Sequence, residues 1–166
     1  VCLESELMYG TSFTVGEEFN SPDFLIPIGK AKIMRQGTDV TIVSYSKGLH
    51  TALQAAEKLA AEGINAEVIN LRTIRPLDID TIAASVKKTG RLVTVEEAWA
   101  THGVGAEIIA ALAETDSFFY LDAPPQRIAT ADVPNPYAFN LEEAWYPQVS
   151  NVVNVAKEIV ARPFKK

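Results

Sequence analysis

The feature that most constrains the fold is a regular alternation of short apolar runs, rich in β-branched residues, with helical segments of about a dozen residues. The strand-like runs cover residues 31–35, 40–46, 66–71, 92–95 and 126–130. Parallel neighbours need a crossover of this length, and such crossovers are right-handed and usually helical. The pattern therefore predicts an α/β fold with a mostly parallel sheet covered by helices on both faces.

The first two strand-like runs are separated by only four residues, 36–39, with the sequence Gln-Gly-Thr-Asp. A connection this short between two extended runs is typical of a hairpin. We therefore predict that residues 31–35 pair with residues 40–46 and add one antiparallel edge strand to the sheet.

The helix ends are marked by residues with known capping preferences. Asp78 is a predicted N-cap, and the helix that follows ends near Lys88 and Gly90. Gly63 stands where an earlier helix should stop, and Ser150 is the predicted N-cap of the last helix.

Composition narrows the class of protein without pointing to a reaction. The 166 residues are 48% hydrophobic, which suits one ordinary folded domain. Acidic residues outnumber basic ones by 21 to 15, and a net charge of −6 disfavours binding to nucleic acid or to an anionic membrane. No apolar run approaches the roughly 20 residues that span a bilayer. The single Cys2 cannot form an internal disulfide, which favours a reducing compartment.

The first residues predict a boundary between two parts of a longer protein. Val1, Cys2 and Leu3 form an apolar strand-like run without an initiator Met, so we expect the sequence to enter in the middle of a protein. Residues 1–29 contain glycine, proline and acids without periodicity, which is typical of a tail or linker. A regular domain is expected over residues 30–166.

Gly103-Val104-Gly105 follows a strand and opens a helix, which is where phosphate-binding loops lie. The third glycine of a dinucleotide fingerprint is replaced by Ile108, and Glu107 would repel a diphosphate. A tight turn with close backbone packing is favoured over an anion site, and both interpretations stay open.

Other polar residues near strand ends could carry chemistry. His50 and His102 have no neighbours at metal-ligand spacing, and a solvent-facing loop position is favoured for His102. Glu96 and Glu97 could be acid–base carboxylates, but neighbouring residues on a strand point to opposite faces and cannot share one proton site. No nucleophile elbow is present, so the residues themselves predict no catalytic, cofactor-binding or metal site.

Two further features favour contacts with partners. Arg72 and Arg75 flank a Pro turn and could grip a carboxylate or phosphate, although ion pairing within this chain or with a partner chain is favoured. Asp122 precedes Pro124 and Pro125, which stiffen its loop, so it could dock a cationic surface at low entropic cost. The alternative for Asp122 is a carboxylate that hydrogen-bonds its own turn.

Six segments in order resemble the C-terminal half of the pyruvate dehydrogenase beta-subunit family. They are residues 3–10, 26–33, 68–78, 103–108, 121–124 and 131–137. The resemblance implies a three-layer α/β/α sandwich of the transketolase C-terminal-domain type. It also implies that residues 1–29 are the end of a preceding pyrimidine-binding domain, with residues 1–4 as its last strand, followed by a linker. The basic end from Arg162 on departs from the family, whose chains end in an apolar residue.

The resemblance further implies a heterotetramer of two alpha and two beta subunits in the mitochondrial matrix, or in the cytoplasm if the protein is bacterial. That enzyme decarboxylates pyruvate on thiamine diphosphate with Mg²⁺ and reductively acetylates a lipoyl group. The cofactor contacts of the beta subunit lie in the other half, so this part is expected to serve assembly and docking and to be inactive alone. The resemblance implies that Asp122 is the partner-binding residue, because it matches the family's aspartate that contacts the subunit-binding domain of the dihydrolipoyl acetyltransferase.

Two alternatives remain at this stage. The first is the beta subunit of a branched-chain 2-oxo acid dehydrogenase, although residues 132–137 and 103–105 are more similar to the pyruvate enzyme. The second is a free-standing regulatory binding domain of flavodoxin-like shape. That class would need a glycine-rich phosphate loop after the first parallel strand, where this chain has Ser-Tyr-Ser-Lys-Gly at residues 44–48.

Overall fold

A computed structural model of the chain describes residues 1–162, and the basic end beyond Arg162 lies outside the described residues. Five strands form one sheet in the order β1-β3-β2-β4-β5. Their bounds are β1 Lys32–Arg35, β2 Val40–Ser44, β3 Ala66–Asn70, β4 Leu92–Trp99 and β5 Gln126–Thr130. Strands β3, β2, β4 and β5 run parallel and β1 is antiparallel, so the predicted mixed sheet with one antiparallel edge strand is confirmed.

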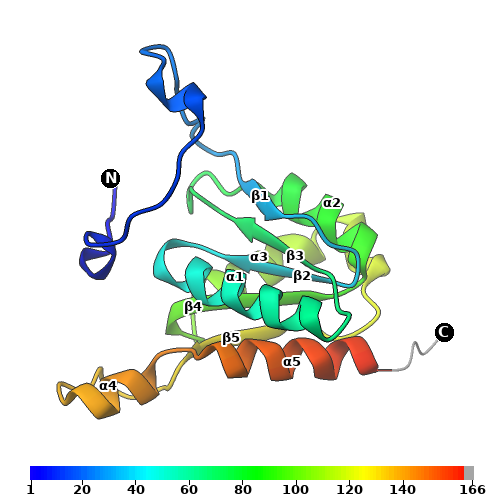
Figure 1. The fold of residues 1–166 in the computed structure, drawn as a ribbon. Coiled ribbons are helices and arrows are strands. Elements are labelled where there is room, and N and C mark those ends of the chain that lie inside the picture. The colour runs from blue at the N-terminus through cyan, green and yellow to red at the C-terminus, as the bar shows by residue number, and fades with distance from the viewer. Residues whose placement is uncertain (163–166) are drawn as a thin grey trace.

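Helices cover both faces of the sheet, as Figure 1 shows. Helices α1 (Ser46–Ala61) and α5 (Val149–Ala161) pack on one face, and α2 (Ile79–Thr89) and α3 (Val104–Ala113) pack on the other. The three-layer α/β/α arrangement is therefore confirmed. A short α4 (Phe139–Trp145) and the 3-10 turn η3 (Asp116–Tyr120), which the sequence patterns did not predict, lie on either side of β5 in the chain.

The predicted hairpin is wrong. Strand β1 pairs with β3, with Lys32 opposite Asn70, and β3 lies between β1 and β2. The connecting segment crosses the start of β3, where the backbone amides of Thr38 and Asp39 donate to the Asn65 carbonyl at 2.9 and 3.0 Å. Gly37 is needed there because a Cβ at this position would collide with the backbone of β3.

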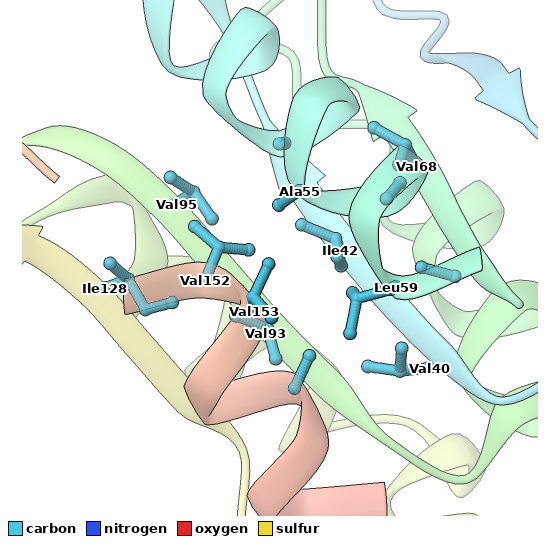
Figure 2. Close-up of a cluster of buried hydrophobic side chains, with 14 of the residues drawn as sticks. Val40, Ile42, Ala55, Leu59, Val68, Val93, Val95, Ile128, Val152 and Val153 are labelled. Carbon is cyan, nitrogen blue, oxygen red and sulfur yellow. The ribbon is translucent and has the colours of Figure 1, made fainter. Parts of the chain in front are cut away.

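The core is divided between the two faces because residues along each strand alternate in direction. In β2, Ile42 packs under α1 and α5, whereas Val43 packs toward α2 and α3. Figure 2 shows the first cluster, where Leu59 of α1 and Val152 of α5 meet the strands. All four side chains are at most 1% exposed, and burying each one stabilises the fold by roughly 1.5–3 kcal/mol.

Two predicted helix starts had different outcomes. The Asp78 carboxylate caps α2 by accepting from the Thr81 hydroxyl at 2.8 Å, and it also accepts from the Ala31 amide at 2.9 Å. The predicted cap at Ser150 is wrong. Helix α5 begins at Val149, and its N-cap is Gln148, which exchanges hydrogen bonds with Asn151 as a capping box.

The N-terminal segment contains only two short 3-10 turns, η1 (Glu6–Met8) and η2 (Glu17–Asn20). It contains no buried residue and extends away from the sheet in Figure 1. The strand-like run at residues 1–4 forms no strand in this structure, because it has no neighbouring strand with which to pair. Within the described residues, no helix is long and apolar enough to cross a membrane.

Candidate functional site

Backbone strain is concentrated at the carboxyl edge of the parallel strands. Ser46, Arg72 and His102 have φ values of 51°, 58° and 58°, and they follow β2, β3 and β4 respectively. Non-glycine residues rarely adopt such values, and strained residues cluster at binding and catalytic sites. This is also the edge at which open α/β sheets bind ligands.

The helix N-terminus that follows β4 is capped by a carboxylate of the chain itself. Glu96 is 1% exposed and accepts from the backbone amides of Val104 at 2.8 Å and Gly105 at 3.0 Å, at the N-terminus of α3. A Cβ on either Gly103 or Gly105 would lie 2.7 Å from a Glu96 carboxylate oxygen. The glycine loop is therefore a tight turn around an internal anion, and the position of an external phosphate is already filled.

The neighbouring Glu97 faces the opposite layer, as the strand alternation predicted. Its carboxylate lies 3.4 Å from the Lys47 ammonium, which lies 3.9 Å from the centre of the Tyr146 ring. On the other side, the Tyr45 hydroxyl donates to Glu96 at 3.4 Å. Burial, reinforced by the charge of Glu96, raises the pKa of Tyr45 to about 12.

A cavity of about 340 Å³ lies beside Lys47 at the same edge. Its lining combines Thr51 of α1 and Glu97 of β4 with Tyr146 and Gln148, which connect α4 to α5. Among the described residues that line it, the one lysine, Lys47, is already paired with Glu97, and Glu142 and Glu143 add two more carboxylates. The cavity defines no ligand.

Neither histidine forms an ion pair with a carboxylate in the part of the chain that the structure describes. His102 is exposed in the loop between β4 and α3, as predicted, and His50 is half-buried in α1. In the described part of the chain, no cluster of three or more His, Cys, Asp or Glu side chains could hold a metal ion.

Asp122 lies at the opposite, amino edge of the parallel strands. Its backbone amide donates to the Gly90 carbonyl at 2.7 Å, and its carboxylate lies 3.7 Å from the Arg91 guanidinium. The Asp122 side chain remains 23% exposed. The carboxylate is therefore held by the turn after α2, rather than by its own turn as one alternative proposed.

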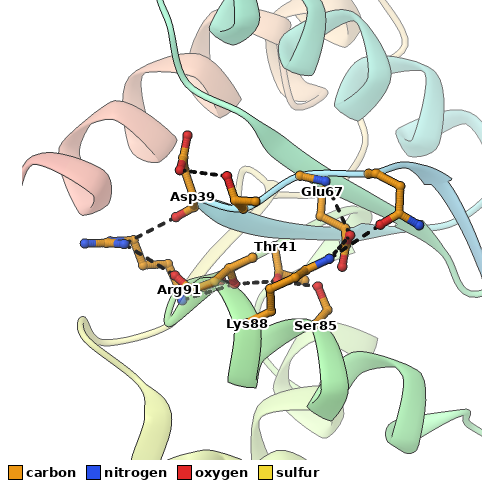
Figure 3. A network of polar contacts seen from close by, with 10 residues as sticks. Asp39, Thr41, Glu67, Ser85, Lys88 and Arg91 are labelled. Carbon is orange, nitrogen blue, oxygen red and sulfur yellow. Dashed lines mark hydrogen bonds and ion pairs between the residues drawn. The ribbon is translucent and has the colours of Figure 1, made fainter.

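Arg91 was missed by the sequence reasoning. Its Nε donates to the Ile159 carbonyl of α5 at 3.1 Å, and its Nη1 donates to the carbonyls of Asp39 and Thr89 at 3.4 and 3.3 Å. Figure 3 shows this side chain joining the start of β2 to the end of α2. Because the Ile159 and Asp39 carbonyls and the Asp122 carboxylate are distant from Arg91 in sequence, only the tertiary fold identifies Arg91 as the residue that holds Asp122.

A second polar cluster lies on the α2 face at the same edge (Figure 3). The Glu67 carboxylate, whose side chain is 1% exposed, pairs with Lys88 and accepts from the Gly37 amide at 3.3 Å. Thr41 contacts the hydroxyls of Ser85 at 2.6 Å and Thr89 at 2.7 Å. These contacts fasten α2 to the sheet and are structural.

Arg72 and Arg75 are both exposed, and neither makes an ion pair with another described residue. Their turn is fixed to the N-terminal segment, because the Gly29 amide donates to the Thr73 hydroxyl at 2.8 Å. Pairing within this chain, one of the two sequence-based alternatives, is not observed among residues 1–162.

The fold and the sequence together define the class of protein. The Transketolase, C-terminal domain family matches residues 29–152, and the chain belongs to that family. Among solved structures, the split-gene transketolase described as an inactive beta4 tetramer superposes with a TM-score of 0.74 at 28% identity. That match covers 88% of this chain and 46% of the other.

Within that class, the chain is a homologue of the beta subunit of the pyruvate dehydrogenase E1 component. It is 60% identical over 162 residues to the mitochondrial subunit beta-1 of Arabidopsis thaliana, covering 98% of this chain and 44% of the relative. It is 56% identical over 158 residues to the mitochondrial subunit beta of Bos taurus, covering 95% of this chain and 44% of the relative. The chain spans less than half the length of these relatives.

The described residues do not fit the thiamine diphosphate and Mg²⁺ that the family implies for the whole enzyme. A magnesium diphosphate needs oxygen ligands for the metal and free amide or basic donors for the phosphates. Residues 1–162 offer no suitable ligand cluster, and the helix N-terminus after β4 is occupied by Glu96.

Proposed function

We propose that the chain is the C-terminal part of a pyruvate dehydrogenase E1 beta subunit. Together with the alpha subunit, the whole enzyme decarboxylates pyruvate on thiamine diphosphate and reductively acetylates the lipoyl group of the acetyltransferase. Residues 1–29 are the end of a preceding pyrimidine-binding domain and the linker that follows it, and residues 30–166 form the transketolase C-terminal-type domain. The observation that carries this proposal is 60% identity to such a subunit over 98% of the chain.

Assembly is the first role proposed for this part, with the alpha subunit and a second beta subunit as partners. Several large apolar side chains at the surface support it. Phe119, Tyr137 and Phe139 are 85%, 103% and 78% exposed, and Leu3 and Leu25 in the N-terminal segment are 90% and 83% exposed. Exposed apolar surface on this scale is typical of subunits that bind partners.

Docking to the subunit-binding domain of the dihydrolipoyl acetyltransferase is the second proposed role, with Asp122 as the contact residue. Its backbone amide donates to the Gly90 carbonyl, its carboxylate lies beside the Arg91 guanidinium, and the side chain is still partly exposed. A fixed, accessible anion suits a cationic partner because little side-chain entropy is lost on binding.

The branched-chain 2-oxo acid dehydrogenase remains the alternative substrate class. The high identity to pyruvate dehydrogenase subunits from both a plant and an animal favours the pyruvate enzyme. Both relatives are described as mitochondrial, which supports a location in the mitochondrial matrix.

The decisive experiment uses the natural full-length protein. It is expressed with a pyruvate dehydrogenase alpha subunit and assayed for decarboxylation of pyruvate and of a branched-chain 2-oxo acid with thiamine diphosphate and Mg²⁺. We expect pyruvate to be the better substrate by at least ten-fold. Preference for the branched-chain acid would favour the alternative, and failure to assemble with the alpha subunit would contradict the proposal.

A further inference from the structure

We propose that the Arg72–Arg75 turn, together with Lys30 and Lys32, is a docking surface for an acidic segment of a neighbouring subunit. This inference rests on the proposed function only in assuming that the chain assembles with other subunits. It concerns a different edge of the sheet from Asp122 and a partner of the opposite charge.

Four basic residues meet here although they are distant in the sequence. Lys32 of β1 lies opposite Asn70 at the end of β3, two residues before Arg72. The Gly29 amide donates to the Thr73 hydroxyl. Lys30 is the next residue after Gly29, so this bond holds its backbone beside the turn. Lys30, Lys32, Arg72 and Arg75 are all exposed.

The shape of this surface is set by close backbone packing. Gly29 has a φ of 78°, and a Cβ there would lie 2.7 Å from Pro76, so the segment and the turn are in contact. Arg72 also has a positive φ, and its amide donates to the Asn70 side chain at 3.1 Å. The two guanidinium groups therefore project from a fixed backbone.

These charges are largely uncompensated. Most other cations in the described residues are paired, as Lys47, Lys87 and Lys157 are with carboxylates. The Asp78 carboxylate, which is 5% exposed, interacts electrostatically with Lys30. Among residues 1–162, none of the four basic residues forms an ion pair within 4.0 Å of a carboxylate. In a chain of net charge −6, a concentration of free positive charge favours an acidic partner.

Apolar side chains complete the surface. Ile74 lies between the two arginines and is 44% exposed, while Ile28 and Met34 on the adjoining segment are 81% and 40% exposed. Arginine and methionine beside exposed apolar groups are typical of protein–protein interfaces. Arginine also binds carboxylates in a bidentate manner, which a guanidinium on a fixed turn can do with little loss of entropy. This mixture favours an acidic protein segment over a free phosphate.

The first test uses this chain and a hexaglutamate peptide as the probe. Side-chain and backbone NMR signals of the ¹⁵N-labelled chain are followed during the titration. We expect shifts concentrated at Arg72 and Arg75, and at least a five-fold increase in Kd for the double variant Arg72→Gln/Arg75→Gln. The matched control is Lys58→Gln, an exposed residue of α1 that makes no ion pair within residues 1–162, and it should change Kd less than two-fold.

Two outcomes would overturn the inference. One is a loss of binding free energy in the double variant no greater than twice that in the Lys58 control, which would mean that the peptide senses only net charge. The other is binding of tripolyphosphate, but not of hexaglutamate, at the two arginines, which would indicate a phosphate site.

A second measurement separates this inference from the proposed function. Assembly of the full-length protein with the alpha subunit is followed by sedimentation velocity, and the double variant is expected to dissociate at a lower salt concentration than the wild type. Identical salt dependence in the two proteins would contradict the inference alone. Failure of the wild type to assemble would contradict the proposed function.

Discussion

The carboxylate of Glu96 accepts a hydrogen bond of 3.0 Å from the backbone amide of Gly105 and thereby caps α3 from inside the sheet. Helix N-termini attract anions because the first amides lack partners and the helix dipole is positive there. In this chain the anion is covalently part of β4. The relationship explains why a glycine loop that resembles a phosphate site serves to pack α3 against β4.

Replacing the buried Glu96 should therefore lower the free energy of unfolding. Glu96→Ala leaves the Val104 and Gly105 amides buried without an acceptor, and we expect a loss of about 2–4 kcal/mol in the free energy of unfolding. The matched control is Glu97→Ala, whose half-buried ion pair with Lys47 should cost about 1 kcal/mol or less. Urea denaturation of both variants checks this, and equal losses would contradict the capping role.

Lys87 and Lys88 give a second matched pair. Lys88 neutralises the buried Glu67, so Lys88→Met should cost about 3–5 kcal/mol because it leaves an uncompensated buried charge. Lys87 pairs with Asp116, whose side chain is 70% exposed, and Lys87→Met should change stability by about 1 kcal/mol or less. Chemical denaturation of the two variants side by side is the measurement. A smaller loss for Lys88→Met than for Lys87→Met would contradict the role of Lys88 as the partner that stabilises buried Glu67.

Asp78 should make folding stability depend on pH in the acid range. Burial alone would raise the pKa of this carboxyl, but hydrogen bonds from Ala31 and Thr81 outweigh it, so the pKa falls below the ordinary 3.8. The carboxylate therefore stabilises the fold fully above about pH 4, and this contribution is lost as the pH falls from 3.8 through the lowered value.

The test of Asp78 is the variant Asp78→Asn, which keeps the shape and removes the charge. We expect it to lower stability by about 0.5–1 kcal/mol at pH 7, because asparagine still caps the helix and only the charge is lost, and by less at pH 3. Thermal unfolding at the two pH values measures the difference. An equal loss at both would show that the charge of Asp78 contributes nothing.

Asp122→Asn should weaken docking to the isolated subunit-binding domain of the acetyltransferase. The carboxylate is partly buried, so we expect the binding free energy to weaken by about 1–3 kcal/mol at low salt, a value between those of exposed and buried ion pairs. At high salt the loss of binding free energy should be smaller, because salt screens the charge. Asp116→Asn, an exposed acid on η3, is the control and should bind like the wild type. Equal affinities of the Asp122 variant and the wild type would contradict the docking role and leave Asp122 with only a structural role beside Arg91.

The isolated chain should not bind thiamine diphosphate with Mg²⁺, because its described residues offer neither a metal cluster nor a free phosphate-binding helix terminus. Isothermal titration calorimetry at up to millimolar cofactor is the measurement. The full-length protein assembled with the alpha subunit serves as the positive control. Micromolar binding to the isolated chain would show that the cofactor site includes residues assigned here to packing.

The sequence by itself determined the local structure. The β-branched runs, the apolar spacing of the helices and the caps Asp78 and Gly90 predict most elements, because these signals act over a few neighbouring residues. Alternation along β4 also predicted correctly that Glu96 and Glu97 face opposite layers. The six family segments predicted the class of fold, which the match over residues 29–152 confirmed.

Only the tertiary structure decided which elements are neighbours and what each charge meets. Nothing local to residues 36–39 indicates that the chain crosses β3 there instead of forming a hairpin, because the Asn65 carbonyl that holds the crossing lies on a distant segment. The same holds for Arg91 beside Asp122 and for Glu96 at the start of α3. These contacts depend on strand order, which periodicity does not encode, and their strength depends on burial, which exists only once the layers have packed.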